Sequence, residues 1–383
     1  MKKKGIYIVS EPACLTPGTG ANKHIEAGLS QLRKYFDVEL ILFFSSPYID
    51  NAKSKAKQVI PQKNNQSWIT KKLKPFFKWP YLFIFNHVHI SKYYKKIKKV
   101  SPDFIYERST YLNFNGIIIA KLLRIPHMYE VNGILAHDHS RYFPEAFNKI
   151  SFWLEKKAYK NTFGFYVGGI NESFKIPANK SFVIQNGIDK EFTTIFKSKL
   201  NKISDKINLT FIGHAMAHHR LDILISALKL LSNPSAFRLH LIGSNLESIK
   251  EKIPDSVETI FYGSLSHEAI SELMKDFHIG VITYALPYYS HVKTFMYGAA
   301  KLAVILPSTS NFKNIFSEDE VIFVKNADPE DISAKLDYIA MNPHVLGSYG
   351  EKIYKSVCKK FTWEEIYEGV SKKITNIIGN SRR

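Results

Sequence analysis

The sequence predicts an α/β protein of two domains, each built on a parallel sheet flanked by helices. Short apolar segments such as 5–9 and 208–213 alternate with segments of helical periodicity. Such alternation is typical of parallel sheets whose two faces are covered by helices. The pattern restarts after a charged link at 197–206, and 383 residues suit two domains of ordinary size. We therefore expect two Rossmann-like domains, over 1–198 and 199–362.

The expected elements follow one another in order along both domains. In the first domain the strands are 5–9, 38–44, 104–106, 126–131 and 163–167, and the helices are 21–34 and 115–123. In the second domain the strands are 208–213, 237–243, 259–262, 279–283 and 303–306, with a helix at 221–231. Ligands of parallel sheets bind outside the carboxyl ends of the strands. We therefore expect the functional residues in the loops that follow these strands, facing a cleft between the domains.

Composition points to a protein of the cytoplasm. Cys14 and Cys358 lie far apart, so their spacing predicts neither a metal site nor a disulfide. So few cysteines fit a reducing compartment. The apolar stretch 5–9 stops at Glu11, which makes it too short for the core of a signal peptide. No apolar run approaches the roughly 20 residues that cross a bilayer. We expect a protein that is soluble or bound peripherally to a membrane.

Positive charge is concentrated in one segment. The formal net charge is +19, and residues 51–100 contain thirteen lysines and no acid. Large aromatic residues, among them Trp68, Trp79 and Phe85, stand between the lysines. Cations mixed with large aromatics suit the anionic face of a membrane. A solvated basic face is the plainer alternative, and we expect no nucleic-acid partner because the lysines come with bulky apolar residues rather than Arg, Gly and Ser.

Several short motifs occur in a telling order. They are Pro17–Gly20, Tyr106–Ser109, Pro126–Gly133 (PHMYEVNG), Gln185–Asp189 (QNGID), Phe211–Gly213 with Leu221–Ile225, Phe261–Gly263, and the segment around Lys293. In order and spacing they resemble the retaining glycosyltransferase family 4, which has the GT-B fold and uses nucleotide-sugar donors. The resemblance runs nearly end to end.

The resemblance implies a hexosyltransferase that needs neither cofactor nor metal and retains configuration. The expected partners are a nucleotide-sugar, a lipid-linked or polysaccharide acceptor of bacterial cell-surface glycan assembly, and an anionic membrane surface that 51–100 contacts. The enzyme would lie at the inner face of the cytoplasmic membrane. The resemblance also implies that a C-terminal helix over 363–383 packs back on the first domain.

The donor side is predicted from the glycines and cations of four loops. Gly18 and Gly20 precede a helix, where backbone can approach a phosphate or the transferred sugar. By resemblance, His214 and His219 stand where relatives present an Arg and a Lys to the diphosphate, with Arg220 beside them and Lys293 near the phosphates. Gly263 and Leu265 fall where relatives hold the base. Arg220 and Lys293 are the expected catalytic cations.

The acceptor side is predicted after two strands of the first domain. Glu107 and Arg108 follow one strand, and an ion pair that only fixes a loop is an equal alternative. Asn132 stands where many relatives have a histidine, so the role of general base falls to Glu130, or else to His137, Asp138 or His139. A leaving phosphate that accepts the acceptor's proton would remove the need for a base. A metal bound by residues 137–139 is disfavoured, because consecutive residues give poor ligand geometry.

One part of the family pattern is missing. No Asp or Glu occurs from Phe277 to Ser317, and Tyr288 and Met296 occupy the places of the two glutamates that hold the donor in relatives. Met296 is nevertheless retained as an expected donor contact. The rival interpretation is a catalytically inactive GT-B protein that serves as a scaffold or partner subunit of a glycan-assembly complex.

Overall fold

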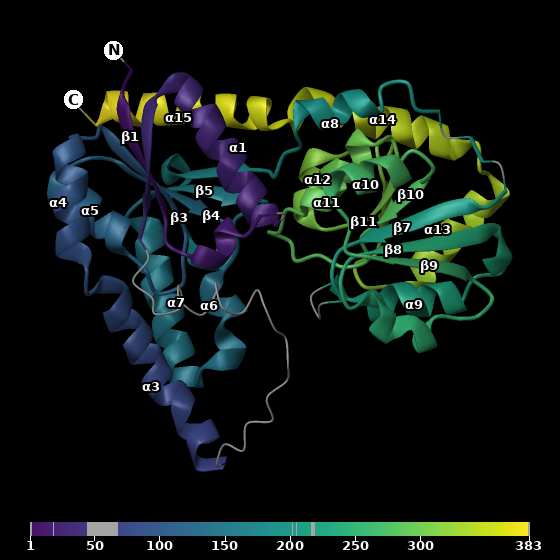
Figure 1. The fold of residues 1–383 in the computed structure, drawn as a ribbon, viewed down its shortest axis with the longest axis horizontal. Helices are drawn as coiled ribbons and strands as arrows, with labels where there is room; N and C mark the ends of the chain where they lie inside the picture. The colour runs from purple at the N-terminus through teal and green to yellow at the C-terminus, as the bar shows by residue number, and fades with distance from the viewer. Residues whose placement is uncertain are drawn as a thin grey trace. The chain divides into compact units, whose positions relative to one another are not determined.

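The structure is a computed structural model that describes residues 2–17, 19–43, 68–200, 202–203, 205–215 and 219–381. It divides into two compact units (Figure 1). Unit 1 comprises Met1–Ile184 and Tyr367–Arg383, and unit 2 comprises Gln185–Ile366. Each unit contains one six-stranded sheet in which all neighbouring strands are parallel. The predicted α/β fold with two Rossmann-like halves is confirmed.

The sheet of unit 1 has the order β2-β1-β3-β4-β5-β6. Its strands are β1 (Lys4–Val9), β2 (Asp37–Leu42), β3 (Phe104–Arg108), β4 (His127–Val131), β5 (Phe163–Val167) and β6 (Ser181–Ile184). Every residue of β3 and β4 is buried, as expected for central strands of a parallel sheet. The order reverses between β1 and β3, so the carboxyl ends of these two strands mark the ligand-binding position in folds of this type.

Helices cover both faces of this sheet. They are α1 (Gly20–Tyr35), α3 (Trp68–His87), α4 (Ile90–Val100), α5 (Asn115–Leu123), α6 (Leu135–Asp138), α7 (Glu145–Lys160) and α15 (Trp363–Asn380), with short 3-10 turns at Pro12–Leu15, Ser140–Tyr142, Glu172–Phe174 and Ala178–Lys180. On one face, Ile6 and Ile8 of β1 share a core with Ile97 of α4 and Ile119 of α5. Tyr7 points to the opposite face, where α1 and α15 lie (Figure 1).

The sheet of unit 2 has the order β12-β11-β10-β7-β8-β9. Its strands are β7 (Ile207–Ile212), β8 (Phe237–Ile242), β9 (Glu258–Gly263), β10 (Ile279–Val281), β11 (Ala303–Pro307) and β12 (Ile322–Val324). Its helices are α8 (Lys190–Ile195), α9 (Leu221–Lys229), α10 (His267–Leu273), α11 (Val292–Ala299), α12 (Ser310–Ile315), α13 (Pro329–Met341) and α14 (Val345–Lys360), with 3-10 turns at Pro234–Ala236 and Leu246–Lys252. Apolar clusters pack on both faces of the sheet. Here the strand order reverses between β7 and β10, and read from β9 it is the Rossmann order.

The chain passes between the two units at two points, after Ile184 and after Ile366. The expected C-terminal helix is α15, and from Tyr367 onward it belongs to unit 1, as the resemblance implied. The sequence put the other boundary at 198, but the structure assigns 185–198 to unit 2. The physical reason is packing, because Phe196 is fully buried in a core of unit 2 and Tyr354 of α14 donates a hydrogen bond to the carbonyl of Thr193.

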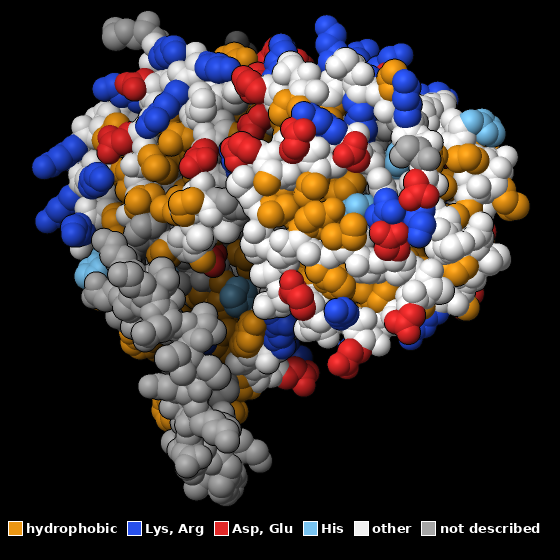
Figure 2. Space-filling view, turned by 45° about the vertical axis from the view of Figure 1, so that its right-hand side comes forward, with side chains coloured by type: hydrophobic (Ala, Val, Ile, Leu, Met, Phe, Trp, Pro, Cys, Tyr) orange, Lys and Arg blue, Asp and Glu red, His pale blue; other side chains and the backbone are white. Residues whose placement is uncertain are grey.

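The basic segment 51–100 is only partly described. Residues 51–67 lie outside the described residues, and 68–100 fall mostly in the helices α3 and α4, which the charge pattern alone had not predicted. Figure 2 shows Lys and Arg side chains gathered at the left-hand edge of the molecule, on the side where α4 lies. In the part of the chain that the structure describes, no helix has both the length and the apolar character needed to cross a bilayer.

Candidate functional site

Three glycines end neighbouring strands of unit 2. Gly213, Gly243 and Gly263 follow or close β7, β8 and β9, and all three have positive φ, at 151°, 142° and 65°. The Gly243 amide donates to the Gly263 carbonyl at 2.7 Å, and the Gly213 amide donates to the carbonyl of Ile242 at 2.8 Å. A Cβ on Gly243 would lie 1.9 Å from the Gly213 oxygen. Only glycine allows these backbones to approach so closely, and the result is an edge of bare main chain at the carboxyl ends of the strands.

Lys293 lies in the first turn of α11, which follows β10 in the chain. Its ammonium lies 4.1 Å from the centre of the Phe211 ring on β7, which is within the range of a cation–π contact. Burial lowers the pKa of Lys293 to about 7. The side chain thus stands beside the β7–β10 reversal, with its charge balanced between the two protonation states near neutral pH.

The loop after β7 brings two histidines together. The Ser244 amide donates to Nδ1 of His214 at 3.3 Å, and the Ser244 hydroxyl lies 2.7 Å from the same nitrogen. His214 therefore carries its proton on Nε2 when neutral. His219 Nδ1 lies 2.6 Å from the His214 carbonyl, so this nitrogen is the donor. Both rings are oriented by these bonds, and they stand beside the edge formed by the three glycines.

Arg220 is committed to another partner. It adopts a left-handed conformation at the start of α9, and its guanidinium forms a fork with Asp222, with Nε–Oδ1 at 3.0 Å and Nη2–Oδ2 at 2.8 Å. The Thr283 hydroxyl donates to the Arg220 carbonyl, which fastens the loop to the end of β10. Arg220 is thus placed at the predicted site, but its charge is already paired. An anion would have to compete with Asp222 for it.

Asparagines hold the acid-free loop that leads into α11. Asn186 donates through Nδ2 to the Ser290 carbonyl at 2.8 Å, and its amide donates to the Ser290 hydroxyl. Asn311 donates to the Tyr289 carbonyl, and Asn326 bonds both the amide and the carbonyl of Ala285. Asn186 of the QNGID motif therefore helps to position the loop before Lys293. In the sequence, the polar residues Gln185 and Asn186 directly after the apolar end of β6 could have indicated this role.

The side chains of two residues predicted at the donor site pack in or against a core of unit 2. Met296 is 8% exposed and belongs to an apolar cluster of unit 2, and Leu265 packs partly buried against the same cluster. Met296 occupies the second turn of α11, where the hydroxyl of its neighbour Tyr297 accepts a hydrogen bond from the Ile212 amide. In this structure the Met296 side chain serves packing, so the prediction of a donor contact from it is corrected.

Glu130 is the centre of a buried polar network in unit 1. Its carboxylate is fully buried and accepts from Arg108 Nη1 at 2.5 Å and from Asn132 Nδ2 at 2.9 Å. Tyrosine hydroxyls donate to its Oε2, at 2.9 Å from Tyr106, 3.3 Å from Tyr367 and 3.5 Å from Tyr7, and the His24 ring lies 3.4 Å from the same atom. The network joins β1, β3 and β4 to α1 and α15.

This environment corrects the role predicted for Glu130. Burial opposes its ionisation, but His24, Arg108 and the bond from Asn132 outweigh burial and hold the pKa of the carboxyl well below its usual range. A general base needs a pKa near the working pH and access to the acceptor's proton. Glu130 has neither. It is a positioning residue that holds Arg108 and Asn132 at the carboxyl edge of β3 and β4.

Glu107 points away from that edge. Successive residues of a strand face opposite sides of the sheet, and Glu107 is 1% exposed with its Oε2 2.8 Å from Nε2 of His127. Its carboxylate also fills the space beside Gly116, where a Cβ would lie 2.2 Å from it. Glu107 is therefore enclosed beneath α5, and its predicted contact with an acceptor is corrected to a buried structural pair.

The other residues of unit 1 that were predicted to be functional follow the strands β1 and β4 in the chain. His137 is exposed in α6, with Nδ1 3.8 Å from the Asp138 carboxylate. The start of α6 is held by Glu155, which accepts from the amides of Leu135 and Ala136 and whose pKa burial raises to about 7. Gly20 is the first residue of α1 and is capped by the Thr19 side chain. Gly18 lies outside the described residues.

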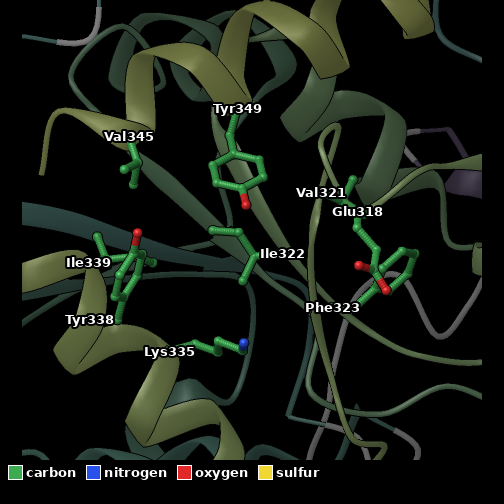
Figure 3. Close-up of a pocket in the computed structure, with 9 residues that line it drawn as sticks. All are labelled: Glu318, Val321, Ile322, Phe323, Lys335, Tyr338, Ile339, Val345 and Tyr349. Atoms are coloured by element: carbon green, nitrogen blue, oxygen red, sulfur yellow. The ribbon is translucent and has the colours of Figure 1, made fainter. Parts of the chain in front are cut away.

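Two other features of the described residues are the lack of a metal-ligand group and a hollow beside β12. Among the described residues, no three His, Cys, Asp or Glu side chains are grouped so that they could hold a metal ion. A hollow of about 230 Å³ lies beside the edge strand β12, with Tyr338, Tyr349 and Lys335 at its walls (Figure 3). None of its lining residues was predicted to bind donor or acceptor.

Structures of known proteins share this architecture over the whole chain. Anabaena HepE in complex with UDP and glucose is 12% identical, with a TM-score of 0.67 over 98% of this chain and 100% of that one. Sucrose-phosphate synthase of Thermosynechococcus elongatus is 13% identical, with a TM-score of 0.70 over 99% and 100%. The lipopolysaccharide outer core galactosyltransferase WaaB is 14% identical, with a TM-score of 0.66 over 98% and 99%. The chain has the GT-B fold.

Sequence comparison adds a match to part of this GT-B chain. Residues 222–370 match the model of a family described as glycosyl transferase-like. The match covers less than half of the chain and lies almost wholly in unit 2, the unit that holds the three-glycine edge and Lys293. No curated protein matches the chain.

Proposed function

We propose that the chain is a glycosyltransferase that moves a sugar from a nucleotide-sugar donor to a lipid-linked or polysaccharide acceptor in bacterial cell-surface glycan assembly. The observation that carries the proposal is the carboxyl edge of unit 2. There, bare glycine backbone, Lys293 and two oriented histidines meet at the reversal of strand order. The glycosyl transferase-like match over 222–370 and the GT-B fold support it.

The donor's diphosphate would bind at this edge. Breaking the bond from sugar to phosphate leaves negative charge on the diphosphate, and cations already in place stabilise it without reorganisation. Protonated Lys293 would supply this charge, His214 would donate through its Nε2–H, and His219 would add charge when its Nε2 is protonated as well. The amides at the start of α11 would add further donors. We propose that these groups replace a metal and that the reaction retains configuration.

We propose that the acceptor's proton passes to the donor's leaving group and that no protein base takes it. Because Glu130 is a buried, fully bonded anion, the proposed proton acceptor is the departing phosphate oxygen itself. Arg108 and Asn132, held by Glu130 at the edge of β3 and β4, would bind the acceptor. A lipid-linked acceptor agrees with peripheral attachment at the inner face of the cytoplasmic membrane, for which the lysines of α4 belong to the described part of the basic segment.

The decisive experiment is donor binding by isothermal calorimetry with a panel of nucleotide-sugars and free nucleotides. HepE was crystallised with UDP and with UDP-glucose, so uridine nucleotides come first in the panel. We expect binding that Lys293→Met and Gly243→Ala weaken and that His137→Ala leaves unchanged. If no nucleotide-sugar binds at millimolar concentration, the proposal fails.

The second candidate is an inactive scaffold or partner subunit of a glycan-assembly complex. It is favoured by Met296, which packs in the core where relatives hold a glutamate, and by the lack of any acid from 277 to 317. A scaffold predicts no turnover with any donor and lipid acceptor even where a nucleotide binds. If the protein releases nucleoside diphosphate from the donor only when an acceptor is present, this candidate is ruled out.

A further inference from the structure

A large, mainly apolar groove lies on the face of unit 1 that α5 and α7 cover. It runs between α5 and α7 and has a volume of about 1100 Å³. Ile118 and Leu122 form one wall, and Leu154 and Ala158 form the other. Its lining extends to the starts of β4 and β5, at His127 and Phe163. The groove is thus separate from the carboxyl edge of the sheet, where Arg108 and Asn132 stand.

Large apolar side chains stand exposed on both helices, in the groove wall on α5 and beside the groove on α7. On α5, Leu122 is 62% exposed and Ile118, one turn earlier, is 38% exposed. On α7, Trp153 is 56% exposed and Ile150 is 43% exposed. Residues three or four positions apart lie on one side of a helix, so each helix presents a stripe of apolar side chains. Exposed apolar surface gathered in this way marks an interaction site.

The same face is almost purely cationic. On the described helices α4, α5 and α7 and the residue that ends α5, the exposed charged side chains are Lys92, Lys95, Lys96, Lys98, Lys99, Lys121, Arg124, Lys149, Lys157, Lys160 and a single acid, Glu145. That acid is paired with Lys149 at 2.8 Å. The Lys157 ammonium lies 4.7 Å from the Trp153 ring, which joins charge and apolar surface at one point. The partner that fits this face therefore combines anionic groups, which would pair with the lysines, with apolar chains, which would fill the groove.

We propose that the outer face of α4, α5 and α7 docks on an anionic lipid bilayer and that the α5–α7 groove receives an acyl chain of one of its lipids. Lysines would lie at the headgroups, while Leu122 and Trp153 would enter the acyl boundary. This deepens the membrane attachment proposed above and rests on it only for the choice of a bilayer as partner. It extends the contact from α4, which lies in the basic segment 51–100, to α5 and α7 outside that segment.

The test measures binding of the full chain to vesicles and the depth of Trp153. Sedimentation is done with vesicles of phosphatidylglycerol and phosphatidylcholine, and with phosphatidylcholine alone. We expect binding only to the anionic vesicles, and at least a tenfold loss of it for Leu122→Glu. The matched control is Leu230→Glu on unit 2, which places the same charge at a similarly exposed leucine and should bind as the parent does.

Lipids with brominated acyl chains test whether α7, which borders the groove, reaches the acyl region of the bilayer. Bromine in the chain should quench part of the tryptophan fluorescence of the bound protein, and Trp153→Phe should remove that part. Equal binding of Leu122→Glu and the parent would overturn the docking face, and the same holds for a partner protein that binds while vesicles do not. Quenching that survives in Trp153→Phe would overturn the entry of α7 into the acyl region and with it the acyl-chain site that α7 borders. Nucleotide calorimetry of Leu122→Glu should match the parent, so a failure of the donor proposal shows separately.

Discussion

At the residue scale, two predicted catalytic groups have lowered pKa values for opposite reasons. Lys293 loses charge because burial removes water from its ammonium. Glu130 keeps its charge, because His24 and Arg108 overcome the cost of burial. The charge of Lys293 therefore changes with pH near neutrality, whereas Glu130 stays ionised and serves to hold its neighbours in place. The same type of shift thus separates a binding residue from a positioning residue.

Binding of UDP should depend on the protonation of Lys293. With a pKa of about 7, the ammonium is mostly charged at pH 6 and mostly neutral at pH 8.5. We expect UDP to bind more tightly as the pH falls over this range, and Lys293→Met to weaken binding about tenfold at pH 6, as expected for one charged hydrogen bond. Calorimetry at several pH values measures both. Since His214 and His219 remain in the variant, the difference between the two profiles isolates Lys293, and parallel profiles would refute the assignment.

Loss of the Glu130 charge should destabilise unit 1. Glu130→Gln leaves the Arg108 guanidinium buried without its counter-charge, which costs about 3–5 kcal/mol of unfolding free energy. Urea unfolding at pH 7 measures the loss, and Glu145→Gln on the surface should be silent. Because folding lowers the pKa of Glu130, the stabilisation is present above its unfolded value and is lost as the pH falls below about 4. A gap between parent and variant that stays constant from pH 7 to pH 3 would contradict the network.

At the element scale, the site of unit 2 depends on how strand ends and loops meet. Each of β7, β8 and β9 ends at a glycine with positive φ, and asparagines hold the loop that leads from β10 to α11. These features position backbone amides and Lys293 without any acid in the loop. The chemistry of the site therefore resides in main-chain geometry more than in charged side chains.

The glycine contact between the β7 and β8 loops gives a sharp prediction. In Gly243→Ala the new Cβ would lie 1.9 Å from the Gly213 oxygen, so the two loops must separate. We expect loss of UDP binding by calorimetry together with a lower midpoint of thermal unfolding. Gly347→Ala in α14 is the control, since nothing lies within 4 Å of its new Cβ and alanine favours a helix by about 1 kcal/mol. Unchanged UDP affinity in Gly243→Ala would show that the donor binds elsewhere.

At the scale of the whole molecule, unit 1 is completed by the end of the chain. From Tyr367 onward α15 covers the face of the sheet opposite α4 and α5, and Val370, Ile374, Ile377 and Ile378 are buried with it. Each such side chain contributes about 1.5–3 kcal/mol by burial. Their sum is comparable to the whole stability of a domain.

Removal of residues 367–383 should therefore unfold unit 1. The truncation strips Tyr367 from the Glu130 network and exposes the apolar face that α15 covers. We expect loss of the near-ultraviolet dichroism of the tyrosines and increased binding of a hydrophobic dye. Removal of 381–383 alone should change neither signal. A truncated chain that keeps the parent's spectrum would show that α15 is dispensable.

The sequence by itself determined the fold class, the order of strands and helices, the glycines at strand ends and the place of Lys293, because these are local patterns of polarity and backbone preference. Only the tertiary structure decided the roles of Glu130, Glu107 and Met296. A carboxylate looks the same in the sequence whether it faces solvent or, like Glu130, six polar groups of the protein, and its chemistry follows from those partners. The α5–α7 groove likewise depends on the tertiary structure, because it forms only where two separate helices pack side by side on one sheet.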